Sequence, residues 1–116
     1  MRPDDTVVLI AWHANPFRGD KFEDAWRPAA AAAIDFGAGY WAFLRSKDDP
    51  LDFVQIASFE TKLDFERYWY SEEIAEARAE ASGLFQVPVL PIWLRAVDAG
   101  EIVYDAPAET AADGGG

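Results

Sequence analysis

The sequence predicts one α+β domain with the element order βαββαβ, the split βαβ arrangement of ferredoxin-like type, in which two helices cover one face of an antiparallel sheet. Three observations lead to this prediction. The chain of 116 residues is long enough for one domain and too short for two. Short β-branched and aromatic runs alternate with stretches of helical periodicity. The expected strands are apolar on both faces.

The first half of the chain supplies one βαβ unit. Residues 6–13, TVVLIAWH, are β-branched and aromatic and too short for a helix, so we expect a strand there. Asp20 followed by Glu23 resembles a capping box, and apolar residues then recur at helical spacing as far as Ile34. Pro28 should kink this helix or begin a second segment. FGAG ends the helix, and residues 39–46 form the second strand.

The second half repeats the pattern. Residues 52–60 form a third strand, paired with the second through the KDDP turn. Thr61 is expected to cap the next helix, and Ser71 caps a continuation that ends at Gly83. Residues 87–97 form the last strand. Its two prolines lack the N–H that a ladder needs, so this strand should lie at an edge or contain a bulge.

The pattern within the strands predicts a partner. In the first strand Val7, Leu9 and Ala11 project to one side, and Val8, Ile10 and Trp12 project to the other. Two helices cover only one face of a sheet, and a monomer would expose the other as a large apolar patch. We therefore expect a homodimer that forms sheet against sheet.

Composition excludes several classes of protein. A formal charge of −11, from 10 basic and 21 acidic residues, argues against nucleic-acid binding and against anionic membranes. No apolar run approaches the roughly 20 residues of a membrane span, and no secretory signal segment is recognisable. With no Cys and one His, we expect no disulfide and no conventional metal site. A cytoplasmic protein is the expected class.

The end of the chain differs from the rest. Residues 98–116 contain five acids, no Lys or Arg, and many Ala and Gly. We expect an ordered domain over residues 1–97 and a largely disordered acidic tail over residues 98–116.

The polar residues inside the strands indicate a candidate site. His13 shares its strand parity with Ala11, and Gln55 shares its parity with Ala57, while Ala42 is the small residue of the second strand. If these alanines face the helices, they leave a hollow rimmed by His13, Gln55 and Tyr40. The expected aromatic wall then consists of Trp26, Tyr68, Trp69 and Trp93. The alternative is that the alanines only make room for neighbouring aromatic rings.

The chemistry expected there is proton transfer from an aromatic substrate. His13 is the one side chain whose ordinary titration lies near neutral pH, so it is the candidate general base. Gln55 or Arg78 would hold the resulting oxyanion, and Tyr40, Tyr68, Trp69 and Trp93 would contact the rings. The alternatives are a solvent-facing His13 at a strand end and an Arg78 engaged in an ordinary ion pair.

Two stretches carry a resemblance to a known family. FETKLDFERYWYSEEIAEAR, residues 59–78, and RGDKFEDAW, residues 18–26, resemble antibiotic biosynthesis monooxygenase domains of the dimeric α/β-barrel superfamily. The resemblance covers about residues 6–97. It implies a barrel-forming homodimer that oxygenates a quinol or polyphenol, often without metal or flavin, because the deprotonated substrate itself reduces O₂. Non-catalytic ligand-binding and stress-response proteins also occur in this superfamily, and they are the alternative function.

A related branch of the same superfamily degrades haem. Alignment on Ser71 puts Tyr68 at that branch's Trp position and Arg78 at the position of its haem-ligating His. The axial ligand of that branch is therefore missing, and we expect no cofactor. A haem held by His13 is the remaining alternative.

Overall fold

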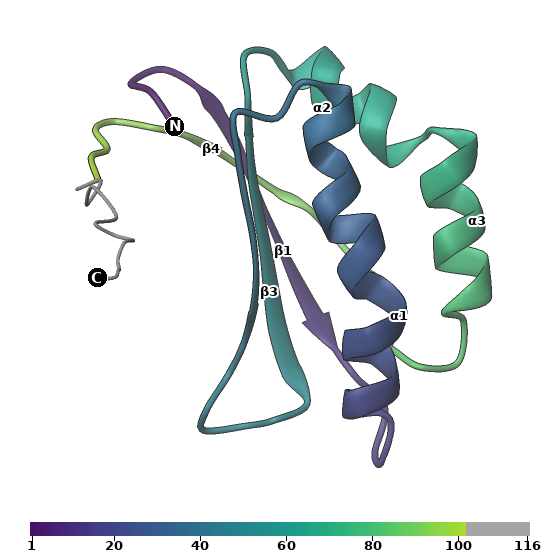
Figure 1. The fold of residues 1–116 in the computed structure, drawn as a ribbon. Helices are drawn as coiled ribbons and strands as arrows, with labels where there is room; N and C mark the ends of the chain where they lie inside the picture. The colour runs from purple at the N-terminus through teal and green to yellow at the C-terminus, as the bar shows by residue number, and fades with distance from the viewer. Residues whose placement is uncertain (102–116) are drawn as a thin grey trace, which may run out of the picture.

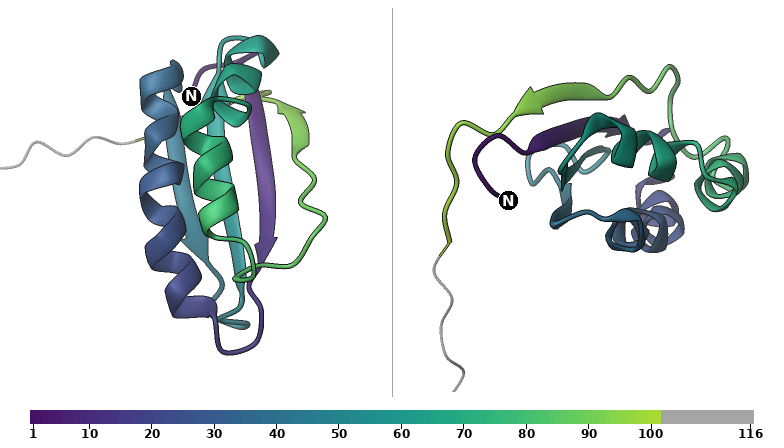
Figure 2. Two further views of the ribbon diagram at one scale, coloured as in Figure 1. Left: turned by 90° about the vertical axis from the view of Figure 1, so that its right-hand side faces the viewer. Right: turned by 90° about the horizontal axis from the view of Figure 1, so that it is seen from above.

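The computed structural model describes residues 1–101 and has the predicted α+β architecture (Figure 1). The elements are β1 (Thr6–His13), α1 (Gly19–Ala31), a 3₁₀ helix η1 (Ala32–Phe36), β2 (Tyr40–Arg45), β3 (Asp52–Phe59), α2 (Lys62–Trp69), α3 (Glu72–Glu80) and β4 (Ile92–Arg95). The sheet order is β2-β3-β1-β4, and every neighbouring pair is antiparallel. The helices lie on one face of this sheet (Figure 2).

The tail expected from residue 98 onward falls largely outside this description, since residues 102–116 are not among the described residues. Within residues 1–101, no helix combines the length and the apolar character needed to cross a lipid bilayer.

The strand register assigns each side chain to a face. Residues directly opposite each other in an antiparallel pair project to the same side of the sheet. Ile10 is opposite Gln55 and Trp12 is opposite Phe53. These four residues are buried under the helices, so they define the helix face. The residues between them, including Leu9 opposite Ile56 and His13 opposite Asp52, define the open face.

An aromatic core joins the sheet to the helices. The Trp12 ring lies 4.7 Å from Trp26, 5.3 Å from Phe22 and 5.0 Å from Phe85, measured between ring centroids. Offset and edge-on ring pairs of this kind add about 0.5–1.5 kcal/mol each beyond the burial of their area. Phe22 and Trp26 recur at helical spacing and are fully buried, which explains why α1 packs on this face.

The helix starts in the second half agree with the sequence. The Thr61 hydroxyl oxygen accepts a hydrogen bond from the Asp64 backbone N–H at 3.3 Å, and α2 follows. The Ser71 hydroxyl oxygen accepts from the Ile74 N–H at 3.2 Å, and α3 follows. Both predicted caps are confirmed.

The start of α1 differs from the prediction. The helix begins at Gly19, and its N-cap residue Arg18 makes no side-chain cap bond. Asp20 lies inside the first turn, and its carboxylate accepts instead from the Arg45 guanidinium at 2.9 Å. A Cβ at Gly19 would crowd Arg45 Nη2 and would lie 3.1 Å from the Pro50 carbonyl oxygen, so this close approach favours glycine. The capping box at Asp20 was therefore a wrong prediction.

Pro28 does not break the helix where we expected. The α-helix continues to Ala31, and the chain then tightens into η1 until Gly37, which has a φ of 95°. Gly37 ends the helix in the left-handed region that glycine adopts without steric cost, as FGAG predicted. The last strand is also shorter than expected. It covers only Ile92–Arg95 and lies at the sheet edge, because the prolines precede its paired part.

Candidate functional site

The space between sheet and helices is filled by a buried hydrogen-bond network centred on Gln55. Its Oε1 accepts from Trp12 Nε1 at 3.1 Å and from Trp26 Nε1 at 2.9 Å. Its Nε2 donates to the Tyr68 hydroxyl at 2.9 Å. Gln55 is 2% exposed, so these bonds satisfy polar groups that water does not reach. Gln55 therefore connects β1, α1 and α2 and has no free face toward a ligand.

Tyr68 completes this network. Its hydroxyl donates to the Ala29 carbonyl oxygen at 2.6 Å. Ala29 follows Pro28 in α1, so the bond ties the last turn of that helix to α2. Burial raises the pKa of the Tyr68 phenol to about 12, against the lowering by its hydrogen bond to Gln55. Tyr68 is thus a neutral structural donor in the core.

The expected hollow with His13 and Gln55 on one floor is wrong. Gln55 lies on the helix face, whereas His13 is opposite Asp52 on the open face. Ala11 and Ala42 also belong to the open face, because they are opposite Val54 and Ile56, and only Ala57 faces the helices. The three alanines therefore do not border a common cavity, and Ala57 is part of the buried core.

His13 instead forms a pair with Asp52 at the end of the open face. Its Nδ1 lies 2.5 Å from Asp52 Oδ1, and the two side chains are 42% and 49% exposed. The carboxylate orients the imidazole through Nδ1 and leaves Nε2 outside this bond. The pair has the chemistry of a solvent-accessible proton acceptor, but it lies on the face away from the aromatic wall.

Two of the predicted aromatic residues do come together, in a groove that we call the α2–β4 groove. It has a volume of about 330 Å³ and lies between α2 and the segment that enters β4. Its lining residues are Lys62, Phe65, Glu66, Trp69, Tyr70, Val89, Leu90, Pro91 and Trp93.

Three rings form the wall of this groove. Phe65 meets Trp93 edge-on at 4.9 Å and stacks with Trp69 at 5.7 Å between ring centroids. Lys62 Nζ lies 4.8 Å from the centre of the Trp93 ring. The groove therefore combines flat apolar surfaces with a cation and a carboxylate, Glu66, at its border.

Arg78 lies behind this wall. Its guanidinium carbon is 4.4 Å from the centre of the Trp69 ring, and its Nη1 donates to the Trp69 carbonyl oxygen at 2.8 Å. Desolvation lowers the pKa of Arg78, while the nearby Tyr70 and Tyr68 oppose this. Arg78 thus holds Trp69 in place. As a permanently protonated group it offers no lone pair to a haem iron at the position that the resemblance assigned to it.

Tyr40 is separated from the other predicted ligand contacts. It is opposite Ser58 on β3 and 44% exposed, at the far edge of the sheet from Trp93. The structure therefore brings together Trp69, Trp93 and, behind them, Arg78. It does not bring Tyr40 or His13 to this group.

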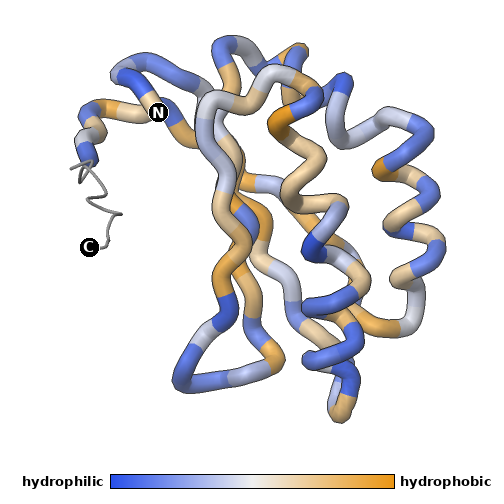
Figure 3. Tube along the Cα trace, viewed as in Figure 1, coloured by the Kyte–Doolittle hydropathy of each residue, from blue (hydrophilic) through white to orange (hydrophobic). Residues whose placement is uncertain are grey.

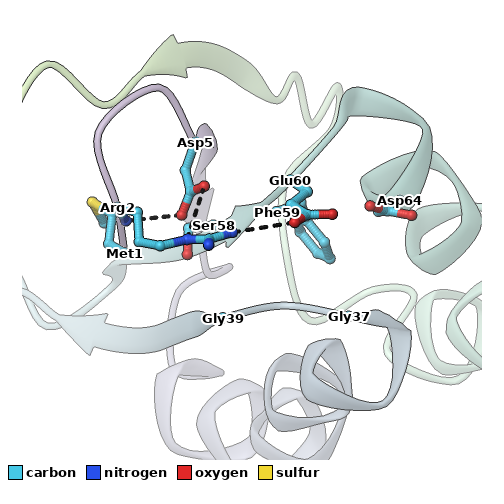
Figure 4. A pocket seen from close by; sticks show the side chains of 9 residues that line it. All are labelled: Met1, Arg2, Asp5, Gly37, Gly39, Ser58, Phe59, Glu60 and Asp64. Carbon is cyan, nitrogen blue, oxygen red and sulfur yellow. Dashed lines mark hydrogen bonds and ion pairs between the residues drawn. The ribbon is translucent and has the colours of Figure 1, made fainter.

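A further pocket of about 400 Å³ lies at the end of β3 where Phe59 and Glu60 leave the sheet (Figure 4). Arg2 pairs with two of its acidic residues: Arg2 Nη2 donates to Glu60 at 3.2 Å, and the Arg2 backbone N–H donates to Asp5 at 2.9 Å. Phe59 is its one ring, so this pocket lacks the flat walls of the α2–β4 groove. Within the described residues Ser58 Oγ is buried there without a hydrogen-bond partner.

Sequence reasoning missed three residues of interest: Lys62, Phe65 and Asp52. Phe65 and Trp69 are four residues apart on one helix, and this spacing places them side by side. Lys62 lies one turn earlier on the same helix. Asp52 begins the third strand, and an antiparallel pairing of that strand with the first would have placed it near His13. Helical spacing could thus have identified Lys62 and Phe65 from the sequence, and strand register could have identified Asp52.

Comparison with known proteins supports the fold. No family model matches the sequence, and no curated protein matches it significantly. A candidate antibiotic biosynthesis monooxygenase from Nitrosomonas europaea superposes with a TM-score of 0.74 at 17% identity, over 84% of this chain and 94% of that one. A mutant of SnoaB, a cofactor-independent oxygenase from Streptomyces nogalater, gives a TM-score of 0.70 at 16% identity, over 83% and 96% of the two chains.

A second Nitrosomonas europaea protein, of unknown function, gives a TM-score of 0.73 at 16% identity and covers 90% of this chain. Identities this low establish the fold alone. The chain has the antibiotic biosynthesis monooxygenase-like fold, so the resemblance drawn from its sequence is confirmed for the fold.

Proposed function

We propose that the protein binds a small planar phenol or quinol in the α2–β4 groove and oxygenates it. The observation that supports this most directly is the aromatic wall, in which Phe65 packs against both Trp69 and Trp93, with the Lys62 ammonium group at its border. Flat rings bind planar aromatic molecules by stacking, and the opening admits a ligand because Trp93 is 38% exposed. The fold shared with a cofactor-independent oxygenase supports the choice of reaction.

The groups at the border of the groove match what such a reaction needs. A phenol must lose its proton before it can reduce O₂. The Lys62 ammonium beside Trp93 attracts the phenolate that results, and the Glu66 carboxylate is available to accept the proton. The phenol and one O₂ then give a quinone and one water. The substrate supplies the electrons, so neither a flavin nor a metal takes part in the oxygenation.

The second candidate function is ligand binding without chemistry. It is favoured by the location of His13, whose imidazole lies on the open face rather than at the groove. Without a base that titrates near neutral pH beside the ligand, deprotonation depends on Glu66 or on solvent. Both candidates require the same groove, and they differ only in O₂ consumption.

The test measures binding and O₂ uptake together. Quenching of tryptophan fluorescence by a panel of naphthoquinols and anthrones gives the affinity, and an oxygen electrode gives the turnover. We expect Trp93→Ala and Lys62→Met each to weaken binding about tenfold, since each removes about 1–2 kcal/mol of ring or charge interaction. Leu63→Ala is the matched control, because Leu63 is exposed on α2 and does not line the groove.

The outcomes separate the two candidates. Groove-dependent binding with O₂ uptake supports the oxygenase. Groove-dependent binding without O₂ uptake across the panel supports the non-catalytic protein. Affinities that are equal in the wild type and in both groove variants would reject the groove as the ligand site.

We also propose that the protein is a homodimer through the open face of its sheet. All four strands contribute apolar residues to this face: Val7, Leu9, Ala11, Ala42, Leu44, Val54, Ile56, Ile92 and Leu94. Figure 3 shows hydrophobic residues along the central strands, with hydrophilic residues gathered in the β2–β3 turn. A second copy presents the same apolar surface, so the two faces can cover each other about a twofold axis.

A further inference from the structure

We propose that His13, Asp49 and Asp52 together bind one divalent transition-metal ion. His13 ends β1, Asp52 begins β3, and Asp49 belongs to the turn that joins β2 to β3. Pairing of β1 with β3 brings the three side chains to one corner of the sheet, separate from the α2–β4 groove. Among residues 1–101 they are the one group of three His, Asp or Glu side chains whose donor atoms converge in this way.

The distances fit a shared ion after small side-chain rotations. One donor atom from each residue lies within 4.8 Å of the other two. Ligand atoms bound to one ion at about 2.1 Å lie roughly 3–4 Å from each other. His13 Nδ1 and Asp52 Oδ1, at 2.5 Å, are closer than this because they are hydrogen-bonded to each other. A shared ion would increase their separation by roughly 0.5–1.5 Å, which a moderate side-chain rotation provides.

The turn holds the carboxylates in a defined arrangement. The Ser46 hydroxyl oxygen accepts from the backbone N–H groups of Asp48 and Asp49, each at 3.1 Å. Asp49 Oδ1 accepts from the Leu51 N–H at 3.0 Å, and the Asp52 N–H donates to the Asp49 carbonyl oxygen at 2.9 Å. These bonds fix the backbone that carries both acids. A preorganised ligand set loses less conformational entropy when the ion binds.

The ligand types select the class of ion. An imidazole nitrogen favours Zn²⁺, Co²⁺ or Ni²⁺ over Mg²⁺ and Ca²⁺, which take oxygen ligands. Two carboxylates balance the charge of a divalent ion. Three protein ligands leave positions for water. His13 and Asp52 are partly exposed in the single chain and lie at the end of the open face, so the ion has a route of entry at this corner of the sheet. The single His in the sequence argued against such a site, but a residue count does not show which carboxylates the fold brings to that His.

The experiment is isothermal titration calorimetry of the full chain, free of any affinity tag, with ZnCl₂ and with CoCl₂. We expect one ion per chain, together with visible absorption bands from bound Co²⁺. His13→Gln and Asp49→Asn should each weaken binding at least tenfold. Asp48→Asn is the matched control, since Asp48 is an acid of the same turn outside the group. Circular dichroism of each variant verifies that it is folded.

Two results would overturn the proposal. One is the absence of saturable binding of either ion by the folded wild-type protein. The other is equal weakening by Asp48→Asn and Asp49→Asn, which indicates diffuse attraction of cations to an acidic chain. A folded His13→Gln variant with wild-type affinity would equally exclude the imidazole ligand.

Discussion

The Gln55 side chain is the centre of a buried network of three side-chain hydrogen bonds in the core. A glutamine on a strand usually indicates an exposed or functional position, but here it accepts two indole N–H groups and donates to a phenol. Three elements would lose a buried partner if its amide were removed. Leaving buried polar groups unpaired costs about 1–3 kcal/mol per group.

Gln55→Leu should therefore lower the free energy of unfolding by about 2–5 kcal/mol, since it leaves two indole donors without an acceptor. The measurement is urea unfolding followed by tryptophan fluorescence. Gln86→Leu is the control, because Gln86 is exposed; it should change stability by less than about 0.5 kcal/mol. An unchanged unfolding midpoint for Gln55→Leu would contradict the structural role.

Tyr68 makes stability depend on pH in the alkaline range. Its phenol has a pKa of about 12 in the folded protein, compared with 10.0 for an ordinary tyrosine. The folded state therefore holds this proton more tightly than the unfolded state does. The contribution is complete below pH 10 and is lost as the pH rises from 10 to 12, and it amounts to about 2–3 kcal/mol.

The comparison that isolates this effect is wild type against Tyr68→Phe. Unfolding free energies measured at pH 9, 10 and 11 should fall more steeply for the wild type than for the variant. Equal slopes for the two proteins would show that Tyr68 ionises as it does in the unfolded chain.

At the scale of residues, the sequence predicted which residues share a face of a strand, but it did not predict which of the two faces lies under the helices. Alternation along a strand shows that His13 goes with Ala11, and that Gln55 goes with Ala57. It does not show which set lies under the helices, because both faces of these strands are apolar. Only the register, with Ile10 opposite Gln55, separates them. Trp69 and Trp93 were predicted correctly as neighbours because aromatic side chains on α2 and β4 share the helix face.

At the scale of secondary-structure elements, the N-cap residues of α2 and α3 each contribute to stability, and a single substitution can test each contribution. Ser71 both accepts from the Ile74 N–H and donates to the Tyr68 carbonyl oxygen at 2.8 Å, so it connects the end of α2 to the start of α3. Loss of an N-cap hydroxyl typically costs about 1 kcal/mol.

Ser71→Ala should thus destabilise the protein by about 1–2 kcal/mol, as measured by thermal or urea unfolding. Ser71→Asp retains an acceptor for the N–H of Ile74 and should recover part of this loss. Ser82→Ala tests for a general effect of removing a serine, since Ser82 is exposed and its hydroxyl caps no helix. If Ser82→Ala destabilises the protein as much as Ser71→Ala does, the loss cannot be assigned to the helix cap.

The elements themselves were predictable because their signals are local. A hydroxyl residue before a helical repeat predicted both later helix starts, and Gly37 predicted the end of η1. The errors arose where tertiary contacts decide. Asp20 looked like a cap, but Arg45 from β2 takes its carboxylate. Pro28 looked like a boundary, but the packing of Ala29 and Ala30 and the Tyr68 bond to Ala29 keep the helix intact to Ala31.

At the scale of the whole molecule, the open face of the sheet is an apolar surface that residues 1–101 cover only in part. Leu44 and Ile92, near its two edges, are each 51% exposed, and Ile56 lies near its centre between Leu9 and Ala42. Apolar area removed from water contributes about 25 cal/mol per Å², and stable homodimers commonly bury about 2,000 Å² or more. Covering this face with a second copy accounts for strands that are apolar on both sides.

Ile56→Lys should therefore convert the protein from a dimer to a folded monomer. The lysine places a charge at the centre of the interface, where a twofold axis brings two such charges together without partners. Sedimentation equilibrium at micromolar concentration measures the mass, and circular dichroism confirms the fold. Leu63→Lys is the matched control, because Leu63 is 54% exposed on α2, away from the open face, and this variant should stay dimeric. If the wild-type protein sediments as a folded monomer, the proposed dimer interface is wrong. The proposed ligand site in the α2–β4 groove does not depend on the dimer and would be unaffected.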